Sequence, residues 1–299
     1  MNFNVKEKIE ELTPLWTGER FPDGRPRVPD KYLKALEKLT LEEVWKPIFV
    51  KGYESQFEGR LKVLHDDGRK LIGRAVTAAY VPMRPDLNEV AMQTGKREGR
   101  TGTYNQWVID SLTDGDVAVI DMYDKIYKGT FLGGNLTTAL KNKTKTGGAV
   151  VWGGIRDVEQ MLKIDTQVYY RGIDPTPIRE FIMSSFNDVT RIGNAVVLPG
   201  DIVFGSHGGV LFIPSHLVAE VVDGAAKTQV KDMFGFEMIT QNKFTTAQID
   251  RNTWTEEMLD LLMEFIKTDS RAEEYRDIDW SEEYDLARNG DPNDTQSAL

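Results

Sequence analysis

The most informative segment of the sequence is GGNLTTALKNKTKTGGAVVWGGIRD, residues 133–157. It contains a glycine turn, a short helix over residues 136–143, a second glycine turn and a buried strand over residues 147–155. It ends in Arg156-Asp157. We expect backbone N–H groups at the first turn and the charged pair after the strand to meet over one end of one sheet. A site for an anion and a metal ion can be built from such parts.

Similar patterns of strands and short helices continue on both sides of this segment. Residues 71–81 read as a strand, residues 104–112 suit a helix, and residues 114–123 read as a turn followed by a buried strand. Strands with interleaved helices predict an α/β fold with a mixed sheet, and we find no internal repeat. Further β segments are expected at residues 167–172, 194–198, 201–204 and 209–213, and a helix at 215–233 with Ser215 as its N-cap.

The region before this core is less regular. Residues 1–30 are predicted to be an arm with one short helix at 5–12 and a passage rich in proline and glycine. Residues 31–46 have helical spacing, with a capping box at Thr40-x-x-Glu43. An Asp67-Gly68 turn is typical of a hairpin.

The pattern changes again from about residue 246. One amphipathic helix is expected at residues 255–267, followed by an acidic stretch and about ten residues that look disordered. Its aromatic side chains would expose apolar surface, so we expect the segment to wrap a neighbouring subunit. The predicted organisation is an α/β domain at 1–245, with its core at about 71–232, and a helical extension at 246–299 with an acidic tail. The aromatic residues in question are Tyr275, Trp280 and Tyr284.

Composition narrows the class of protein. A net charge of −10 argues against a general nucleic-acid binder, which needs a basic face. Apolar runs long enough to span a membrane are absent, the N-terminus does not resemble a secretory signal, and cysteine is absent. These features predict a cytoplasmic protein, with neither nucleic acid nor membrane as a partner.

Arg156 and Asp157 are the first candidates for chemistry. A carboxylate after a buried strand can hold Mg²⁺ or Mn²⁺ through oxygen ligands and waters. A guanidinium can bind a carboxylate with two hydrogen bonds and stabilise charge that develops on an enolate. The alternatives stay open, because Asp157 can simply cap its helix and Arg156 can be a surface residue or part of a structural salt bridge.

The glycine turn offers a second set of candidates. The N–H groups of Asn135, Leu136 and Thr137 open a helix and can bind an anion with the help of the helix dipole. Gly134 in the same turn is a further candidate for substrate binding. Glycine turns before helices are common, so this feature alone indicates little.

The segment resembles the RraA-like proteins, which include 4-hydroxy-4-methyl-2-oxoglutarate aldolases and the RNase E regulator RraA. Those aldolases carry an acidic residue, twenty intervening residues and then Arg-Asp. Here twenty residues separate Asn135 from Arg156-Asp157, and Leu136 is also kept. The resemblance implies that the turn binds the substrate carboxylate, that Arg156 contacts the same substrate and that Asp157 anchors the metal ion.

The resemblance covers about residues 71–232. Pro199-Gly200-Asp201 and Gly209-Val210 match the family, whereas Ser206-His207-Gly208 replaces an acidic turn. His207 is therefore a candidate acid or base, with an exposed loop histidine as the alternative. Asn135 replaces the acidic residue and cannot serve as a base.

The aldolases also place an acidic residue from a late helix near the metal ion of a neighbouring subunit. Asp232 is the better positional match in this chain, and Glu237 is the second choice. Either can equally be an ordinary acid on a helix surface. The family fold is a layered α/β/α-type sandwich that forms trimers or hexamers, so the resemblance implies a homotrimer or homohexamer.

These observations predict a lyase dependent on Mg²⁺ or Mn²⁺ that acts on a 2-oxo acid or a related sugar acid. Retro-aldol cleavage or decarboxylation would proceed through a metal-stabilised enolate. A hydratase or dehydratase that uses the same site is one alternative, and a non-catalytic regulator that binds a protein, as RraA does, is another. A methyltransferase is rejected because the glycine-rich nucleotide-binding pattern is missing.

Overall fold

The computed structural model describes residues 3–290, and the chain divides into two compact units between Val221 and Val222. The division falls inside helix α8 (Val218–Thr240), earlier in the chain than the predicted domain boundary between residues 245 and 246. Within residues 3–290, none of the helices is both long enough and apolar enough to cross a membrane.

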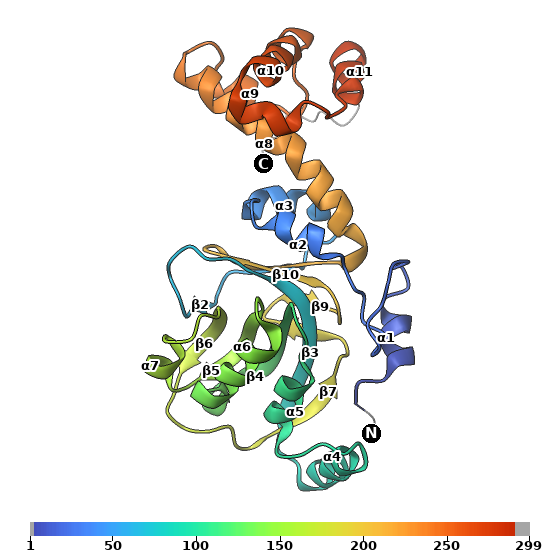
Figure 1. The fold of residues 1–299 in the computed structure, drawn as a ribbon, viewed down its shortest axis with the longest axis vertical. Coiled ribbons are helices and arrows are strands. Elements are labelled where there is room, and N and C mark those ends of the chain that lie inside the picture. The colour runs from blue at the N-terminus through green and yellow to red at the C-terminus, as the bar shows by residue number, and fades with distance from the viewer. Residues whose placement is uncertain (1–2, 291–299) are drawn as a thin grey trace. The chain divides into compact units, whose positions relative to one another are not determined.

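A mixed sheet forms the centre of the first unit (Figure 1), with nine strands within residues 3–290. Four consecutive strands run parallel: β3 (Leu71–Pro82), β4 (Asp116–Leu132), β5 (Gly148–Ile155) and β6 (Val168–Ile173). The predicted α/β class with a mixed sheet is therefore confirmed. The antiparallel members are β1 (Phe57–Glu58), β2 (Lys62–Val63), β7 (Phe181–Phe186), β10 (Ile202–Ser206) and β11 (Gly209–Ile213).

Different elements cover the two faces of this sheet. One face packs against helices in a large apolar cluster that includes Trp107, Leu140 and Met161. The other face packs against a small two-stranded ribbon through Ile192 and Val197. The helices are α4 (Pro85–Arg97), α5 (Tyr104–Ser111), α6 (Gly134–Thr144) and α7 (Val158–Met161), and the ribbon consists of β8 (Thr190–Ile192) and β9 (Ala195–Val197).

The parallel strands have two ends, and we call the sides of the sheet where they end and begin the carboxyl edge and the amino edge. At the carboxyl edge the parallel strands β4 and β5 end at Leu132 and Ile155, and the loops that follow carry the predicted site. At the amino edge β3 and β4 begin at Leu71 and Asp116. Loops at the carboxyl ends of parallel strands are where α/β proteins commonly bind ligands.

The N-terminal arm is anchored to the first unit by buried polar contacts. Arg25 is 2% exposed and pairs with Asp116, which is fully buried, at 2.8 Å between Nη1 and Oδ1. The two charges can be buried here because each has the other as a partner. The arm contains the predicted short helix α1 (Lys6–Leu12).

Several sequence predictions for the segment between the arm and β3 need correction. Residues 31–46 are not one helix but two, α2 (Asp30–Leu36) and α3 (Leu41–Phe49), because the Thr40-Glu43 capping box starts a new helix. Asp67-Gly68 does not close a hairpin, since β2 pairs with β6 and β3 pairs with β4, β7 and β10. Gly68 nevertheless has φ of +81°, so the turn itself is present.

Other elements were missed or misplaced by the sequence reading. Pro85 begins α4, a helix that the sequence did not predict, and proline is well suited to the first turn of a helix. Strands β7 and β8 were not predicted. Ser215 lies inside a short 3-10 helix, η1 (Ser215–Leu217), and makes no side-chain cap, while α8 continues to Thr240.

The second unit is helical and has an apolar core of its own. Trp254, Leu262, Phe265 and Trp280 belong to one buried cluster there. Tyr275 and Trp280 are 8% and 5% exposed, so the apolar surface that suggested contact with a neighbouring subunit is covered within the unit. Beyond α8, its helices are α9 (Thr246–Ile249), α10 (Glu256–Thr268), η2 (Ser270–Tyr275) and α11 (Ser281–Asn289).

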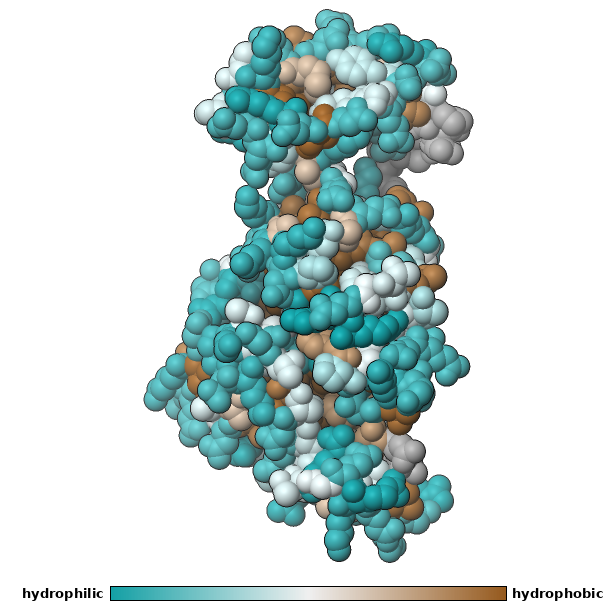
Figure 2. All heavy atoms as spheres, turned by 45° about the vertical axis from the view of Figure 1, so that its right-hand side comes forward, coloured by the Kyte–Doolittle hydropathy of each residue, from teal (hydrophilic) through white to brown (hydrophobic). Residues whose placement is uncertain are grey.

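The predicted helix at residues 255–267 is α10, and the Thr255 hydroxyl caps it by accepting the N–H of Met258. The predicted disordered tail lies largely outside the described residues. Hydrophilic residues dominate the surface that Figure 2 draws, with scattered apolar ones between them. Isolated apolar side chains of this kind are normal on protein surfaces.

Candidate functional site

The predicted site lies at the carboxyl edge, where the ends of β4 and β5 meet the start of α6. Gly133 follows β4 directly and is the N-cap of α6. Arg156 follows β5, and its N–H donates to the carbonyl oxygen of Leu132 at 2.9 Å. The structure therefore brings the glycine turn and the Arg-Asp pair together, as the sequence predicted.

Asp157 connects the two segments through its side chain. Its Oδ2 accepts the N–H of Gly134 at 3.1 Å, so the carboxylate caps α6 and not its own helix α7. The backbone at Asp157 is left-handed, with φ 56° and ψ 35°. Few residue types other than glycine, asparagine and aspartate accept this conformation, and it turns the carboxylate back toward α6.

Two glycines make this close approach possible. A Cβ on Gly133 would lie 2.5 Å from Asp157 Oδ2 and 3.1 Å from Arg156 Nε. A Cβ on Gly134 would lie 2.3 Å from Gln160 Oε1. Because real Cβ atoms do not approach so closely, side chains at residues 133 and 134 would displace the groups that surround the turn.

Arg156 and Asp157 form an ion pair in a partly open position. Arg156 Nη1 lies 3.2 Å from Asp157 Oδ2, and the two side chains are 39% and 28% exposed. Both groups therefore remain in contact with solvent and can reach a ligand. A guanidinium has five N–H donors, so this pair leaves donors free for a substrate carboxylate.

The N–H groups of the turn are not all available to an anion. The Gly134 N–H is bound by Asp157, and the Thr137 N–H donates to the carbonyl oxygen of Gly133 at 3.0 Å. Thr137 is also fully buried. In the described part of the chain, the N–H groups of Asn135 and Leu136 have no protein acceptor, so the anion-binding part of the predicted turn narrows to these two.

His207 does not join this site within the chain. It lies in the turn between β10 and β11, and Gly205 of β10 pairs with Leu71, the first residue of β3. His207 is therefore at the amino edge, at the opposite end of the parallel strands from Arg156. Its Nδ1 lies 3.4 Å from Asp66 Oδ1, and both side chains are exposed.

The predicted metal ligands fall in different units. Asp157 belongs to the first unit, whereas Asp232 and Glu237 lie on the part of α8 that belongs to the second. Glu237 is paired there with Arg271. Three or more His, Asp or Glu side chains in a metal-binding arrangement do not occur within residues 3–290.

The residues at the turn fit one kind of metal ion. Mg²⁺ and Mn²⁺ are commonly held by one or two carboxylates, with water and substrate as further ligands. Asp157 provides one partly exposed carboxylate, and it retains acceptor capacity beyond the Gly134 bond. A largely hydrated ion anchored on Asp157 matches this donor set, whereas a closed cage of protein ligands does not.

Two functional features escaped the sequence reading. Gln160 lies against the glycine turn, and the Asp157-x-x-Gln160 spacing could have suggested it, since this spacing is typical of a capping box. The second feature, the capping of α6 by the Asp157 side chain, has no such signal in the sequence. It depends on contacts between residues 23 positions apart.

Comparisons with known proteins identify the family of the chain. A model of the RraA-like family, described as Aldolase/RraA, matches residues 43–212, more than half of the chain. Protein DlpA of Legionella pneumophila is 32% identical over 165 residues, which are 52% of this chain and 23% of that protein. A putative 4-hydroxy-4-methyl-2-oxoglutarate aldolase of Halalkalibacterium halodurans is 26% identical over 128 residues, 43% of this chain and 60% of that protein.

This chain thus spans less than two thirds of either relative. Among solved structures, Streptomyces coelicolor RraAS2, an unusual member of the RNase ES inhibitor RraA protein family, is similar in fold, with a TM-score of 0.59. It is 23% identical, and the similarity covers 71% of this chain and 97% of that one. On the match over residues 43–212, this chain belongs to the RraA-like family.

Proposed function

We propose that the carboxyl-edge site binds a small 2-oxo acid and cleaves a carbon–carbon bond next to its carbonyl group. The observation that carries the proposal is the Asp157–Gly134 hydrogen bond of 3.1 Å, which holds the Arg156-Asp157 pair against the start of α6. The family match and the distant putative aldolase support a lyase. The substrate class rests on the chemistry of the site.

Substrate binding would use the donors that the chain leaves free. The substrate carboxylate would accept the N–H groups of Asn135 and Leu136, with the positive end of the α6 dipole behind them. The Arg156 guanidinium would contact the carbonyl oxygen, where negative charge collects when the bond breaks. Asp157 would hold Mg²⁺ or Mn²⁺, an ion that neutralises charge on carbonyl and carboxylate oxygens.

Asn135 favours one reaction over the other. Retro-aldol cleavage begins with removal of a hydroxyl proton, which calls for a base, and an asparagine amide cannot accept that proton. Decarboxylation of a 3-carboxy-2-oxo acid needs no base. The bond electrons pass from the leaving CO₂ to the enolate, which Arg156 stabilises and water then protonates at C3. We therefore propose β-decarboxylation as the better match, with retro-aldol cleavage second.

The test is release of pyruvate from oxaloacetate and from 4-hydroxy-2-oxo acids, with Mg²⁺, with Mn²⁺ and with EDTA. Oxaloacetate decarboxylates spontaneously, and faster with metal ions, so every rate is taken relative to metal without protein. Turnover by the wild type and its loss in Arg156→Ala and Asp157→Ala are the expected results. Binding of Mn²⁺, followed by electron paramagnetic resonance, should weaken in Asp157→Ala alone.

A matched control is available at the amino edge. Arg69 pairs with Asp67 in a partly exposed ion pair, at 2.6 Å between Nη2 and Oδ2. Arg69→Ala therefore removes a comparable guanidinium far along the sheet and should leave turnover unchanged. Equal activity of Arg156→Ala and the wild type would refute the proposed role of Arg156. Absence of turnover on the whole panel, without Mn²⁺ binding, would favour a protein-binding regulator instead.

A further inference from the structure

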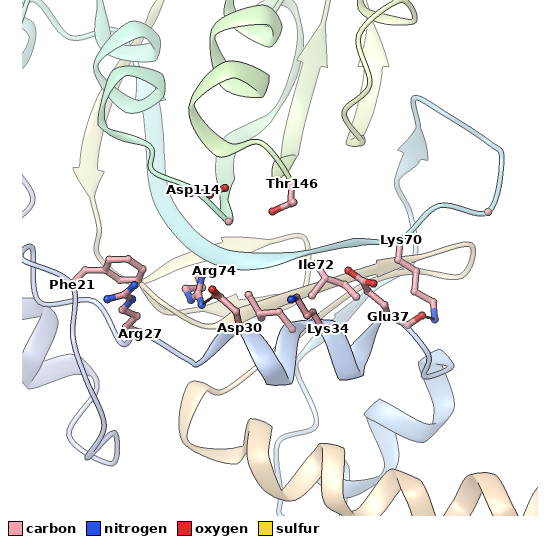
Figure 3. Close-up of a pocket in the computed structure, with 13 residues that line it drawn as sticks. Phe21, Arg27, Asp30, Lys34, Glu37, Lys70, Ile72, Arg74, Asp114 and Thr146 are labelled. Atoms are coloured by element: carbon pink, nitrogen blue, oxygen red, sulfur yellow. Dashed lines mark hydrogen bonds and ion pairs between the residues drawn. The ribbon is translucent and has the colours of Figure 1, made fainter. Parts of the chain in front are cut away.

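A cavity of about 740 Å³ lies at the amino edge of the sheet. Figure 3 shows Asp30 and Lys34 of α2, and Glu37 directly after it, in a row with Ile72 and Arg74 of β3. Asp114 and Thr146 face this row from the loops before β4 and β5. Cavities of this size are large enough for small organic ligands.

Residues from two sources build the cavity. Ile72, Arg74, Asp114, Gly115 and Thr146 lie within the matched range 43–212. Phe21, Arg27 and the lining residues of α2 lie before that range. The family match therefore supplies only half of the wall, and the arm and α2 of this chain supply the rest.

Arg74 is the main polar group of the cavity. Its side chain is 4% exposed, its Nε donates to the Val28 carbonyl oxygen at 2.9 Å, and its Nη2 binds Asp30. Its Nη1 makes no hydrogen bond within residues 3–290, although a buried guanidinium normally uses its donors. A Cβ on Gly115 would lie 2.9 Å from this Nη1, so the glycine keeps the donor uncovered.

Other cationic groups face the same space. Lys34 is exposed on α2 and has no ion-pair partner among the described residues. Within residues 3–290, Lys70 donates to the backbone carbonyl oxygens of Glu37 and Leu39 and makes no direct ion pair. The acidic residues are largely engaged, because Asp30 pairs with Arg74 and Asp114 pairs with Lys145.

The balance of charge therefore favours an anion. The lining contains four cationic and three acidic side chains within the described residues, although the chain as a whole carries −10. Arg27 and Arg74 pair with Glu19 and Asp30, so Lys34 and Lys70 are the cations without a direct ion pair in this part of the chain. Leu33 and Ile72 add apolar surface beside the cationic groups. The Phe21 ring supports them at one end, with Arg27 and Arg74 at 5.5 and 5.6 Å from its centroid.

We propose that this cavity binds a small organic anion. Its carboxylate, sulfonate or phosphate group accepts hydrogen bonds from Arg74 Nη1 and Lys34, and its apolar body rests on Leu33 and Ile72. The Thr146 hydroxyl, on the facing loop, is a further donor. This site is separate from the one that contains Arg156 and does not depend on the proposed lyase activity.

The test uses a fluorescent anion, 1-anilinonaphthalene-8-sulfonate, with the full chain. Its neutral counterpart, N-phenyl-1-naphthylamine, reports binding that needs no charge. We expect saturable binding of the sulfonate to one site, weakened about tenfold by Lys34→Glu because a favourable charge becomes a repulsive one. Thr146→Trp, which fills the cavity from the opposite wall, should weaken both probes.

Lys31→Glu is the matched control, because Lys31 is exposed on the same helix but does not line the cavity. It makes the same change of net charge and should leave the affinity within about twofold, since exposed charges at a distance are screened. Circular dichroism checks that each variant is folded. The proposal is overturned by a lack of saturable binding, by equal affinity of Lys34→Glu and the wild type, or by equal losses in Lys31→Glu and Lys34→Glu.

Discussion

The two edges of the sheet differ in how deeply their ion pairs are buried. At the carboxyl edge, Arg156 and Asp157 stay partly exposed and are held by short contacts to a glycine turn. At the amino edge, Arg25 and Asp116 are buried and connect the arm to the start of β4 across 91 residues of sequence. The carboxyl edge lies entirely within the family match, whereas the amino edge depends on residues before it.

The difference separates the part of the chain that the family model matches from the part that precedes it. The exposed pair contributes little to stability, because solvent weakens the attraction between exposed charges. The buried pair is needed to keep the arm in place, since either charge alone would be strongly unfavourable inside the protein. Substitutions at one edge should therefore change chemistry, and substitutions at the other should change stability and anion binding.

The largest effect is expected from Arg25→Ala. It leaves the Asp116 carboxylate buried without a cation, and we expect the free energy of unfolding to fall by about 3–5 kcal/mol in urea denaturation. Sulfonate binding at the amino edge should be lost, while turnover per folded molecule is kept. Arg27→Ala is the control in the same arm, where an exposed pair with Glu19 predicts a loss of about 0–1 kcal/mol. Similar losses in both variants would contradict the distinction.

A second buried aspartate, Asp201, sharpens the comparison, because it has no cationic partner among the residues that the structure describes. Asp201 is 4% exposed, its carboxylate accepts the Leu198 N–H at 2.8 Å, and burial raises its pKa to about 7. The folded protein therefore keeps a proton that the unfolded chain releases near its ordinary pKa of 3.8. This contribution to stability is fully present below that value and is lost as the pH rises through about 7.

The measurement is the difference in unfolding free energy between wild type and Asp201→Asn from pH 4 to 8. The stability of the wild type relative to the variant should fall with rising pH by up to about 1.4 kcal/mol per pH unit. Asparagine carries no titratable proton, so other groups cancel in the difference. A difference that does not change with pH would show that Asp201 is charged in the folded protein.

Gly133→Ala tests the carboxyl edge without touching a charged residue. The backbone at Gly133, with φ −144°, suits alanine, so the new Cβ acts only by displacing Asp157 and Arg156. We expect the kcat/KM for pyruvate release to fall about 100-fold, because small displacements of reacting groups can lower a rate by this much. Gly134→Ala should cost less, because its Cβ meets only the flexible end of Gln160. Equal activity of Gly133→Ala and the wild type would show that the close approach is unnecessary.

The smallest effect is expected at the capping box between α2 and α3. Thr40→Ala removes the acceptor of the Glu43 N–H and should lower the free energy of unfolding by about 1 kcal/mol. Thr40→Ser keeps the hydroxyl and should stay close to the wild type. Thermal denaturation of the three proteins is the check, and a serine variant as unstable as the alanine variant would point to packing and not to the cap.

The sequence predicted those parts of the fold that depend on local patterns. Strands β3 and β5, helix α6 and the Thr40-Glu43 box follow from the spacing of apolar and polar residues, and all are present. β7 was missed because its pairing partner, β3, is about a hundred residues away in sequence. Its position is set by tertiary contacts and not by its own composition.

For the candidate site, too, the sequence predicted only what depends on local spacing. Spacing brought the start of α6, with Asn135, and the Arg156-Asp157 pair after β5 to the same edge of the sheet, because a helix and a strand of known length separate them. The position of His207 could not be read in the same way, since it depends on which end of β3 its hairpin pairs with. The cavity at the amino edge was not foreseen either, because residues 21–37 and 68–146 meet there only after folding.

The start of the arm has a consequence for the order in which the protein forms. The Asn4 side chain accepts a hydrogen bond from Asn187, 183 residues later, and the Asn4 N–H donates to the carbonyl oxygen of Phe186. A ribosome adding about 5–20 residues per second takes roughly 10–40 s to make the intervening chain. During that time the first residues lack their partners, and β3 still lacks β7 and β10 beside it. Until then an apolar central strand has open edges, and this interval is when the nascent chain is most exposed to aggregation.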